Sequence, residues 1–299
     1  MRQERQFVLA PAARPRRSAL YLPASNARAI AKARDLPCDV VILDLEDAVA
    51  PDAKTEAREL AVEAVKAGGF GARELVIRVN GFDTPWGAED VAAVSAVRPD
   101  ALLIPKVSAP ADFAPYAGAG PRLWAMIETC AAVFALETLG AASARNGVDV
   151  WVIGSNDLSK EMRCRPGLDR APLQPALALS VMAARAHGLS ILDGVWNDIA
   201  DLDGLAVECA QGANFGFDGK TIIHPSHLDA TNRAFSPEQA AVAWARTVAA
   251  AFDLPESAGK GVLKIEGRMV ERLHLAQTKR LIAVAEAIAV HEALAAGEG

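Results

Sequence analysis

Two carboxylates follow neighbouring apolar segments in the middle of the chain. Glu128 ends the segment LWAMIE, and Asp157 ends the next segment, VWVIGSND. Adjacent strands of a sheet lie about 4.8 Å apart, so carboxylates at two adjacent strand ends can share one hard cation. Mg²⁺ usually takes one or two protein carboxylates and leaves its other positions to water and substrate. We therefore favour a metal site for the pair, with helix capping or a salt bridge as the alternative for each residue.

A second acidic group, Asp44-Leu45-Glu46-Asp47, ends the apolar segment VVILDLED. Side chains alternate along a strand, so Asp44 and Glu46 share one face, and acids this close need cations nearby. Three cations end other apolar segments: Arg78, Lys106 and Lys220. Arg78 could stabilise negative charge that develops on an oxygen or could simply pair with Glu46 or Asp47. The group as a whole is either part of an active site or an internal salt-bridge network.

The apolar segments that carry these residues alternate with stretches of helical pattern. Long apolar runs are typical of parallel strands that are buried on both faces. The expected strands cover residues 18–23, 40–46, 74–80, 101–106, 122–128, 149–155, 190–195 and 213–218. Such alternation predicts a (β/α)₈ TIM barrel or a doubly wound sheet. No Gly-x-Gly-x-x-Gly follows a strand, so we favour the α/β barrel, in which chemistry occurs at the carboxyl ends of the strands.

The rest of the chain is organised around this barrel. We expect a flexible basic tail over residues 1–17, the catalytic barrel over 18–235 and a C-terminal helical segment over 236–299. Within the last segment, the Gly- and Lys-rich stretch ESAGKGVLKIEGR suggests a mobile or extended connection between helices. We interpret the C-terminal segment as a lid over the active-site mouth or as an oligomerisation element.

Composition excludes several classes of function. The net charge of −6 argues against nucleic acid as the main partner, and no apolar run reaches the length of about 18 residues that a membrane span needs. The four cysteines show no metal-type spacing, as expected for free thiols in a reducing compartment. These features predict a cytoplasmic protein with a small-molecule substrate.

Several motifs together resemble the HpcH/HpaI aldolase–citrate lyase superfamily, and within it the CitE-like and malyl-CoA lyase branch. They are LYLPASN, VVILDLEDAVAPDAKTEAR, IRVNGFDTPWGAEDV, LLIPKV, MIET, DGVWNDIADLDGL and GFDGKTIIHPSH. The resemblance runs from about Ser18 to Phe235 and continues weakly to the end of the chain. It implies a Mg²⁺-dependent TIM-barrel lyase, with Mn²⁺ as an alternative ion. The implied reaction cleaves a 3-hydroxyacyl-CoA thioester of the malyl-CoA or citramalyl-CoA type to a 2-oxo acid and an acyl-CoA.

The resemblance also assigns roles to individual residues. It matches Glu128 and Asp157 to the metal ligands and Arg78 to an arginine that contacts substrate oxygens. Glu46 and Asp47 match an acidic pair beside the metal. Lys32 falls where the family places a basic residue near the phosphates of coenzyme A, and Tyr21, in LYLPASN, is assigned with Lys32 to binding of the CoA thioester. The family further implies a homo-oligomer, a trimer or a hexamer.

Departures from the family pattern leave the reaction outcome open. In the malyl-CoA lyase-like branch, a C-terminal motif of the type Gly-Lys-Met-Val-Asp delivers an acid to a neighbouring subunit. Here the motif is GRMVE at residues 267–271, so Glu271 is one methylene longer than the expected Asp. Ser155-Asn156-Asp157 also stands where many relatives have Ala-Glu-Asp or Ala-Ala-Asp. Thioester hydrolysis is therefore an alternative to carbon–carbon cleavage.

Three other functions stay open at this point. The chain could be a citrate lyase β subunit that acts on a citryl acyl-carrier-protein thioester, or a non-catalytic barrel-type binding subunit. It could also be an aldolase for free 2-oxo acids, which would not need CoA.

Overall fold

The computed structural model of the protein describes residues 14–296. Within them the chain forms two compact units, which meet in sequence between Phe235 and Ser236. The larger unit begins at Arg16 and contains the predicted barrel.

Eight parallel strands close into a barrel in the order β1-β2-β3-β4-β5-β6-β7-β8, which confirms the predicted TIM-barrel fold. The strands are β1 Ser18–Pro23, β2 Val40–Asp44, β3 Glu74–Arg78, β4 Ala101–Ile104, β5 Arg122–Ile127, β6 Val148–Ile153, β7 Ser190–Asp193 and β8 Gly219–Ile222. Their side chains are almost all buried, because one face of each strand fills the barrel and the other packs against helices.

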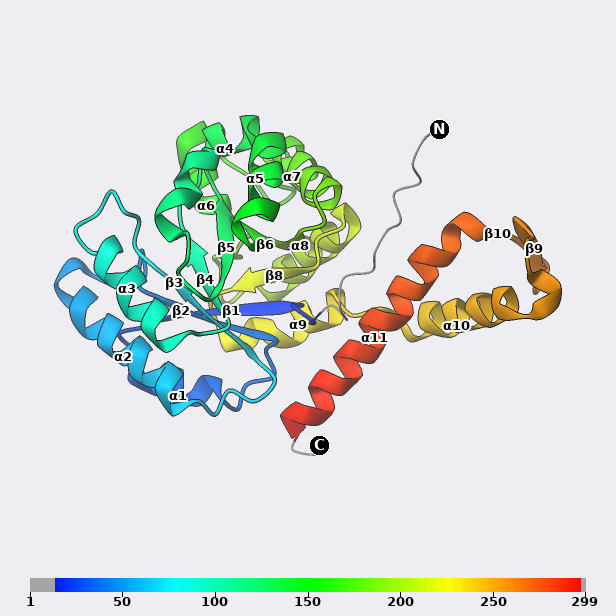
Figure 1. Cartoon of the computed structure of the whole chain (residues 1–299), viewed down its shortest axis with the longest axis horizontal. Coiled ribbons are helices and arrows are strands. Elements are labelled where there is room, and N and C mark those ends of the chain that lie inside the picture. Colours follow the sequence, from blue (N-terminus) through cyan, green and yellow to red (C-terminus); the bar gives the residue numbers. More distant parts are fainter. Residues whose placement is uncertain (1–13, 297–299) are drawn as a thin grey trace. The chain divides into compact units, whose positions relative to one another are not determined.

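The helices of this unit lie outside the barrel, as Figure 1 shows. They are α1 Ala27–Ala33, α2 Lys54–Ala67, α3 Gly87–Val97, α4 Cys130–Phe134, α5 Leu136–Asn146, α6 Ser155–Met162, α7 Gln174–Ala186, α8 Leu202–Phe215 and α9 Leu228–Ala234. The predicted cap of the first helix is present, since the side chain of Asn26 accepts a hydrogen bond from the backbone N–H of Ala29.

The last strand is shorter than predicted and begins later. Residues 213–215, which we expected to begin a strand, are the end of helix α8. The helix stops at Gly216, whose positive φ of 93° suits glycine, and β8 begins only at Gly219. The apolar residues before Gly216 belong to the helical repeat of α8, and a short apolar run cannot by itself distinguish the two structures.

The start of the barrel unit also differs from the predicted boundary. Arg17, which we placed in the flexible tail, is buried and donates two side-chain hydrogen bonds of 2.9 Å to the carboxylate of Asp39. Arg16 donates a hydrogen bond of 2.6 Å to Glu74. Both arginines are therefore part of the barrel, and residues 1–13 of the predicted tail lie outside the described residues.

Lys220 does not offset the acids at the end of β2, contrary to our prediction. It lies within β8, where its fully buried ammonium group is 2.5 Å from Glu208 and 3.5 Å from Asp193 and donates a hydrogen bond to the carbonyl of Gly194. Arg170 also donates hydrogen bonds to both carboxylate oxygens of Asp193, at 2.8 and 3.0 Å. This network links β7, β8 and α8, so Lys220 has a structural role.

The second unit contains the helices α10 Gln239–Asp253 and α11 Leu275–Ala296. Between them, the stretch that we expected to be mobile or extended forms an antiparallel hairpin of β9 Val262–Ile265 and β10 Arg268–Glu271. Val248, Phe252 and Ile265 form the centre of its small apolar core. In the described part of the chain, no helix is both long and apolar enough to span a membrane.

We expect Lys220→Met to destabilise the protein strongly, because it leaves Glu208 and Asp193 buried with less compensating charge. Removing one partner from a buried ion-pair network typically costs about 3–5 kcal/mol. The free energy of unfolding, measured by urea titration, should fall by that order. Lys66→Met, at an exposed position of α2, is the control and should change stability by less than about 0.5 kcal/mol. A small effect at both positions would contradict the structural role of Lys220.

Candidate active site

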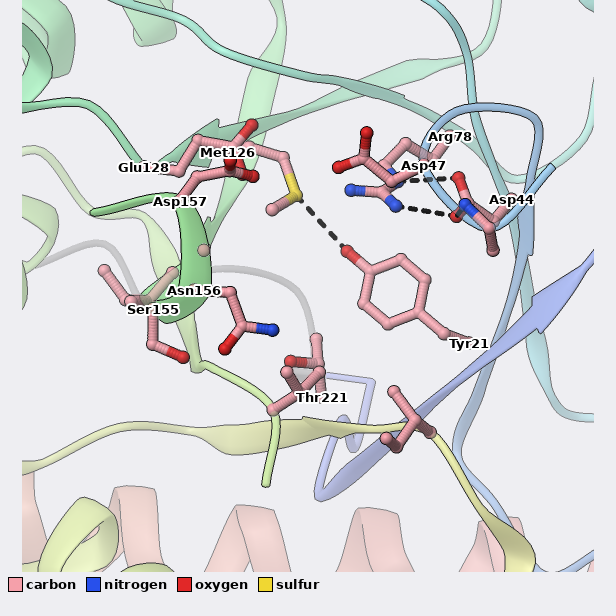
Figure 2. Close-up of a pocket in the computed structure, with 15 residues that line it drawn as sticks. Tyr21, Asp44, Asp47, Arg78, Met126, Glu128, Ser155, Asn156, Asp157 and Thr221 are labelled. Carbon is pink, nitrogen blue, oxygen red and sulfur yellow. Dashed lines mark hydrogen bonds and ion pairs between the residues drawn. The ribbon is translucent and has the colours of Figure 1, made fainter. Parts of the chain in front are cut away.

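A cavity of about 290 Å³ opens at the carboxyl end of the barrel strands (Figure 2). Its lining comes from both halves of the barrel: Tyr21, Asp44, Asp47, Ala48, Arg78, Met126, Glu128, Ile153, Gly154, Ser155, Asn156, Asp157, Val195, Thr221 and Ile223. Most of the polar residues singled out in the sequence therefore meet in one place, as expected for a barrel enzyme.

Arg78, at the end of β3, is held on one side of the cavity by Asp44 of the adjacent strand β2. Its Nε and Nη2 donate hydrogen bonds of 2.7 and 2.6 Å to the two carboxylate oxygens of Asp44. Nη1 lies 2.8 Å from a carboxylate oxygen of Glu46. Burial alone would lower the pKa of Arg78, but Asp44 and Glu46 outweigh this effect and raise the pKa well above its ordinary value. The guanidinium group therefore stays charged.

The donors of Arg78 are only partly used by these acids. A guanidinium group has five N–H bonds, and Asp44 accepts two of them. The guanidinium carbon lies 5.0 Å from the centre of the Tyr21 ring, over its face. Arg78 thus lines the cavity and has N–H groups beyond those that Asp44 accepts.

Asp44 also shapes the acidic turn that follows β2. It accepts hydrogen bonds from the backbone N–H groups of Glu46 and Ala48, at 2.9 and 3.0 Å. Glu46 in turn pairs with the ammonium group of Lys106 at 2.7 Å, whereas Asp47 is 3.9 Å from it. The predicted roles of Arg78 and Lys106 as counter-charges for these acids agree with the geometry.

Glu128 lies on the other side of the cavity, directly after β5. It is 1 % exposed, and one of its oxygens accepts a hydrogen bond of 2.7 Å from the backbone N–H of Lys106. Burial raises the pKa of Glu128 to about 7, and the negative charges of Glu46 and Asp157 act in the same direction. Without a cation, this carboxylate is thus unusually costly to ionise.

Asp157 lies close to Glu128 because β5 and β6 are neighbours, with Ile127 paired to Ile153 (Figure 2). It occupies the first turn of α6, a helix that begins after Gly154 without a side-chain cap. Helix capping, one alternative for Asp157, is therefore not its role. Within residues 14–296, neither carboxylate forms a salt bridge with a protein cation.

The chemistry of this pair suits a divalent cation. Carboxylate oxygens are hard ligands of the kind that Mg²⁺ binds, and burial without a counter-ion is costly unless something is bound. Gly154 leaves room for Glu128, since a Cβ atom at this position would overlap its carboxylate. The described residues contain no cluster of three or more His, Cys, Asp or Glu side chains that could hold a metal. Water and substrate would have to complete the coordination of an ion bound here.

The other predicted site residues lie in different places. Tyr21 lines the cavity, and its hydroxyl donates a hydrogen bond of 3.2 Å to the sulfur of Met126, a weak acceptor. Lys32 is exposed on α1 and is not part of the cavity lining. Glu271 is exposed at the end of β10, in the second unit. The structure therefore brings Tyr21 to the site, while the roles of Lys32 and Glu271 stay predictions.

The sequence analysis missed the specific role of one site residue, Asp44, and did not recognise another, Gly154. We treated Asp44 only as one of several acids, yet it anchors Arg78 and organises the turn after β2. The strand alternation that placed Asp44 on one face with Glu46 was the available signal. Gly154, which makes space for Glu128, gave no signal beyond its place at the end of a strand.

Comparisons with known proteins find relatives over most of the chain. The model of the HpcH/HpaI aldolase/citrate lyase family matches residues 17–225. A (3S)-malyl-CoA thioesterase of Cereibacter sphaeroides is 45% identical over 283 residues, which cover 94% of this chain and 98% of the relative. An L-malyl-CoA/beta-methylmalyl-CoA lyase of the same species is 31% identical over 313 residues, with coverage of 93% and 97%.

Solved structures show the same similarity. CitE of Mycobacterium tuberculosis, in complex with magnesium, acetoacetate and coenzyme A, superposes with a TM-score of 0.74 at 28% identity. The match covers 92% of this chain and 100% of the CitE chain.

We expect Glu128 to make stability depend on pH in a direction opposite to that of a salt-bridged carboxyl, whose pKa is lowered on folding. Its pKa is about 7 when folded and near the ordinary 4.5 when unfolded, so the native state binds the proton more tightly. Relative to Glu128→Gln, the wild type should lose of the order of 3 kcal/mol between pH 4.5 and pH 7.5. The difference in unfolding free energy between the two proteins, measured with chelator present, should follow this trend. A difference that is independent of pH would contradict the burial of an ionisable Glu128.

Proposed function

The chain belongs to the HpcH/HpaI aldolase/citrate lyase family, and on this basis we propose that it is a Mg²⁺-dependent enzyme acting on the CoA thioester of a small 3-hydroxy acid, of the malyl-CoA type. The observation that carries the proposal is the cavity with Glu128 and Asp157 on one side and Arg78 on the other. The relatives that act on malyl-CoA support the substrate class, and the CitE complex supports the metal and the coenzyme.

Glu128 and Asp157 would hold the ion, which is Mg²⁺ or, by the same preference for hard oxygen ligands, Mn²⁺. When bound, the ion supplies Lewis-acid polarisation of the hydroxyl and carboxylate oxygens of the hydroxy-acid end. Arg78 then interacts with the thioester end of the substrate. Its free N–H groups stabilise negative charge on the carbonyl oxygen, and because Asp44 already fixes the guanidinium group, little reorganisation is needed during the reaction.

Two outcomes are chemically compatible with this arrangement, because both place negative charge on the thioester oxygen. Hydrolysis gives free CoA and a hydroxy acid, whereas carbon–carbon cleavage gives a 2-oxo acid and an acyl-CoA. We place hydrolysis first, since the thioesterase relative is 45% identical and the lyase relative 31%. The change from the Asp of the lyase-like branch to Glu271 supports the same order. Carbon–carbon cleavage, favoured in the sequence analysis, is the second candidate.

Coenzyme A would bind at the mouth of the barrel, and we propose that Lys32 contacts its phosphates. Lys32 is exposed in the last turn of α1, with its ammonium group free to reach a flexible ligand. We also propose that the protein works as a homo-oligomer, a trimer or a hexamer, in which Glu271 acts as acid or base in the site of a neighbouring subunit.

The test of the proposal is turnover of (3S)-malyl-CoA with Mg²⁺, in which free thiol and 2-oxo acid are measured separately. We expect free thiol without an equivalent amount of oxo acid, and no turnover with chelator. Oxo acid without thiol would instead establish the lyase. Absence of both products, with either Mg²⁺ or Mn²⁺, would contradict the proposed substrate class.

We expect Asp157→Asn to lower turnover on the order of a hundredfold, the scale seen when one group that stabilises developing charge is removed. The apparent affinity for Mg²⁺, measured by calorimetry, should weaken in parallel. Asp203→Asn is the matched control, because Asp203 is an exposed acid in the first turn of another helix, α8. Equal activity of the wild type and Asp157→Asn would contradict the metal assignment.

Glu271→Gln should lower kcat more than it changes KM, because the proposed acid or base moves a proton rather than binding the ground state. Mixing this variant with Asp157→Asn under conditions of subunit exchange should restore part of the activity, since mixed oligomers contain sites with one intact copy of each residue. Unchanged kcat in Glu271→Gln would remove the residue from the mechanism, and failure of the mixture to regain activity would contradict its action on a neighbouring subunit.

A further inference from the structure

The backbone of the acidic turn after β2 is held by a lysine that the chemistry described above does not use. Lys54 is the first residue of α2 and is 6 % exposed. Its ammonium group donates a hydrogen bond of 2.7 Å to each of the carbonyl oxygens of Leu45 and Glu46. A third hydrogen bond, of 2.8 Å, goes to the side-chain oxygen of Asn80. An ammonium group has three N–H bonds, so all of them are engaged.

Stability alone does not account for a lysine at this position. In the described part of the chain Lys54 forms no salt bridge, and its three acceptors are uncharged oxygens. Burial lowers the pKa of Lys54, although the charges of Asp44 and Glu46 oppose this effect. The residue also begins a helix, where the helix dipole disfavours a cation. A position that breaks local rules in this way is expected where a residue contributes to function.

Asn80 ties the same turn to the end of β3. Its side-chain nitrogen donates hydrogen bonds of 2.9 Å to the carbonyl of Leu45 and 2.6 Å to the carboxylate of Asp90. Asp90 is fully buried and also accepts a hydrogen bond of 2.7 Å from Arg58 of α2. These partners fix the amide of Asn80, so that its oxygen faces Lys54. The carbonyl of Leu45 thus accepts from two side chains that come from different elements.

The turn that is held in this way carries Glu46, which bridges two cations of the site. The carboxylate of Glu46 lies 2.8 Å from Nη1 of Arg78 and 2.7 Å from Nζ of Lys106. Asp44 binds the N–H groups of the turn, and Lys54 binds its carbonyl groups. In the described residues, Lys54 is the one side chain that binds the carbonyl of Glu46. Its removal would therefore free the part of the turn from which the Glu46 carboxylate projects.

We propose that Lys54 is a positioning residue for the reaction, because it holds the turn in the form that keeps the Glu46 carboxylate on Arg78. The inference rests on the proposed function, in which Arg78 stabilises negative charge on the thioester oxygen. Lys54 is not part of the cavity lining, so it acts on the reaction through Glu46 rather than by contact with the substrate.

The test is Lys54→Met, a substitution that keeps an unbranched side chain and removes the charge and the three donors. Turnover of (3S)-malyl-CoA with Mg²⁺ is measured at a temperature at which circular dichroism shows the variant to be folded. We expect kcat to fall on the order of a hundredfold, the scale of a displacement of about 1 Å at a catalytic group. KM and the apparent affinity for Mg²⁺ should not change, because only transition-state stabilisation is lost.

Lys66→Met is the matched control, because Lys66 is an exposed lysine in the last turn of the same helix. It should keep the kcat of the wild type. An unchanged kcat in Lys54→Met, or a change confined to KM, would overturn the proposal.

A double variant distinguishes positioning from a general loss of structure. Glu46→Gln keeps the shape of the side chain and weakens its pairing with Arg78, so it should also lower kcat. If Lys54 acts through Glu46, the variant with both substitutions should be no slower than the slower single variant. Effects on kcat that multiply would overturn the route through Glu46.

If Lys54→Met does not fold, Lys54→Gln decides instead, because its amide can still donate to one of the two carbonyls. We expect kcat to fall about tenfold at unchanged KM, the scale of one hydrogen bond to a charged group. A kcat equal to that of the wild type would overturn the proposal.

A crystal structure of the folded variant tests the inference separately from the proposed function. We expect the carboxylate of Glu46 to move away from Nη1 of Arg78, while the hydrogen bonds between Arg78 and Asp44 remain. An unchanged separation of 2.8 Å would overturn the positioning role. If the wild type does not turn over malyl-CoA, the proposed function falls and this structure decides whether Lys54 holds Glu46. Normal turnover by both wild type and variant contradicts the inference alone.

Discussion

The buried ion pair between Arg78 and Asp44 is the interaction on which the site depends. Asp44 binds two nitrogens of the guanidinium group and accepts two backbone N–H groups of the turn after β2, so four donors converge on one carboxylate. Buried charges are tolerated only when they are paired and hydrogen-bonded in this way. The pair thereby fixes the orientation of Arg78 and the path of the acidic turn at the same time.

The remaining charges at the barrel mouth are distributed unevenly. Glu46 has both Arg78 and Lys106 as partners, whereas Glu128 and Asp157 have no salt-bridge partner in the part of the chain that the structure describes. One side of the cavity thus offers hydrogen-bond donors and the other offers uncompensated carboxylates. A ligand that combines a divalent cation with electronegative oxygens complements both sides, as a metal-bound hydroxy-acid thioester does.

Most of this arrangement follows from the sequence, because strand neighbours in a parallel barrel are also neighbours along the chain. Glu128 and Asp157 could be placed together since each ends an apolar run and the two runs are consecutive. Which charged side chains pair with one another could not be predicted in the same way. Lys220 and the acids of β2 both belong to the barrel, but the side-chain packing directs Lys220 to Glu208. Similarly, Ala213 and Phe215, which we expected in a strand, continue α8 as partly buried residues until Gly216 ends the helix.

The central claim is that Glu128 and Asp157 hold a divalent ion beside the hydroxy acid. The most direct test is a crystal structure of the protein with Mn²⁺ and malate, in which anomalous scattering locates the metal independently of any assay. We expect one Mn²⁺ bound by both carboxylates, with malate oxygens among its other ligands and the malate on the side of Arg78. An ion that is bound elsewhere, or malate bound in this cavity without contact to a metal, would contradict the account.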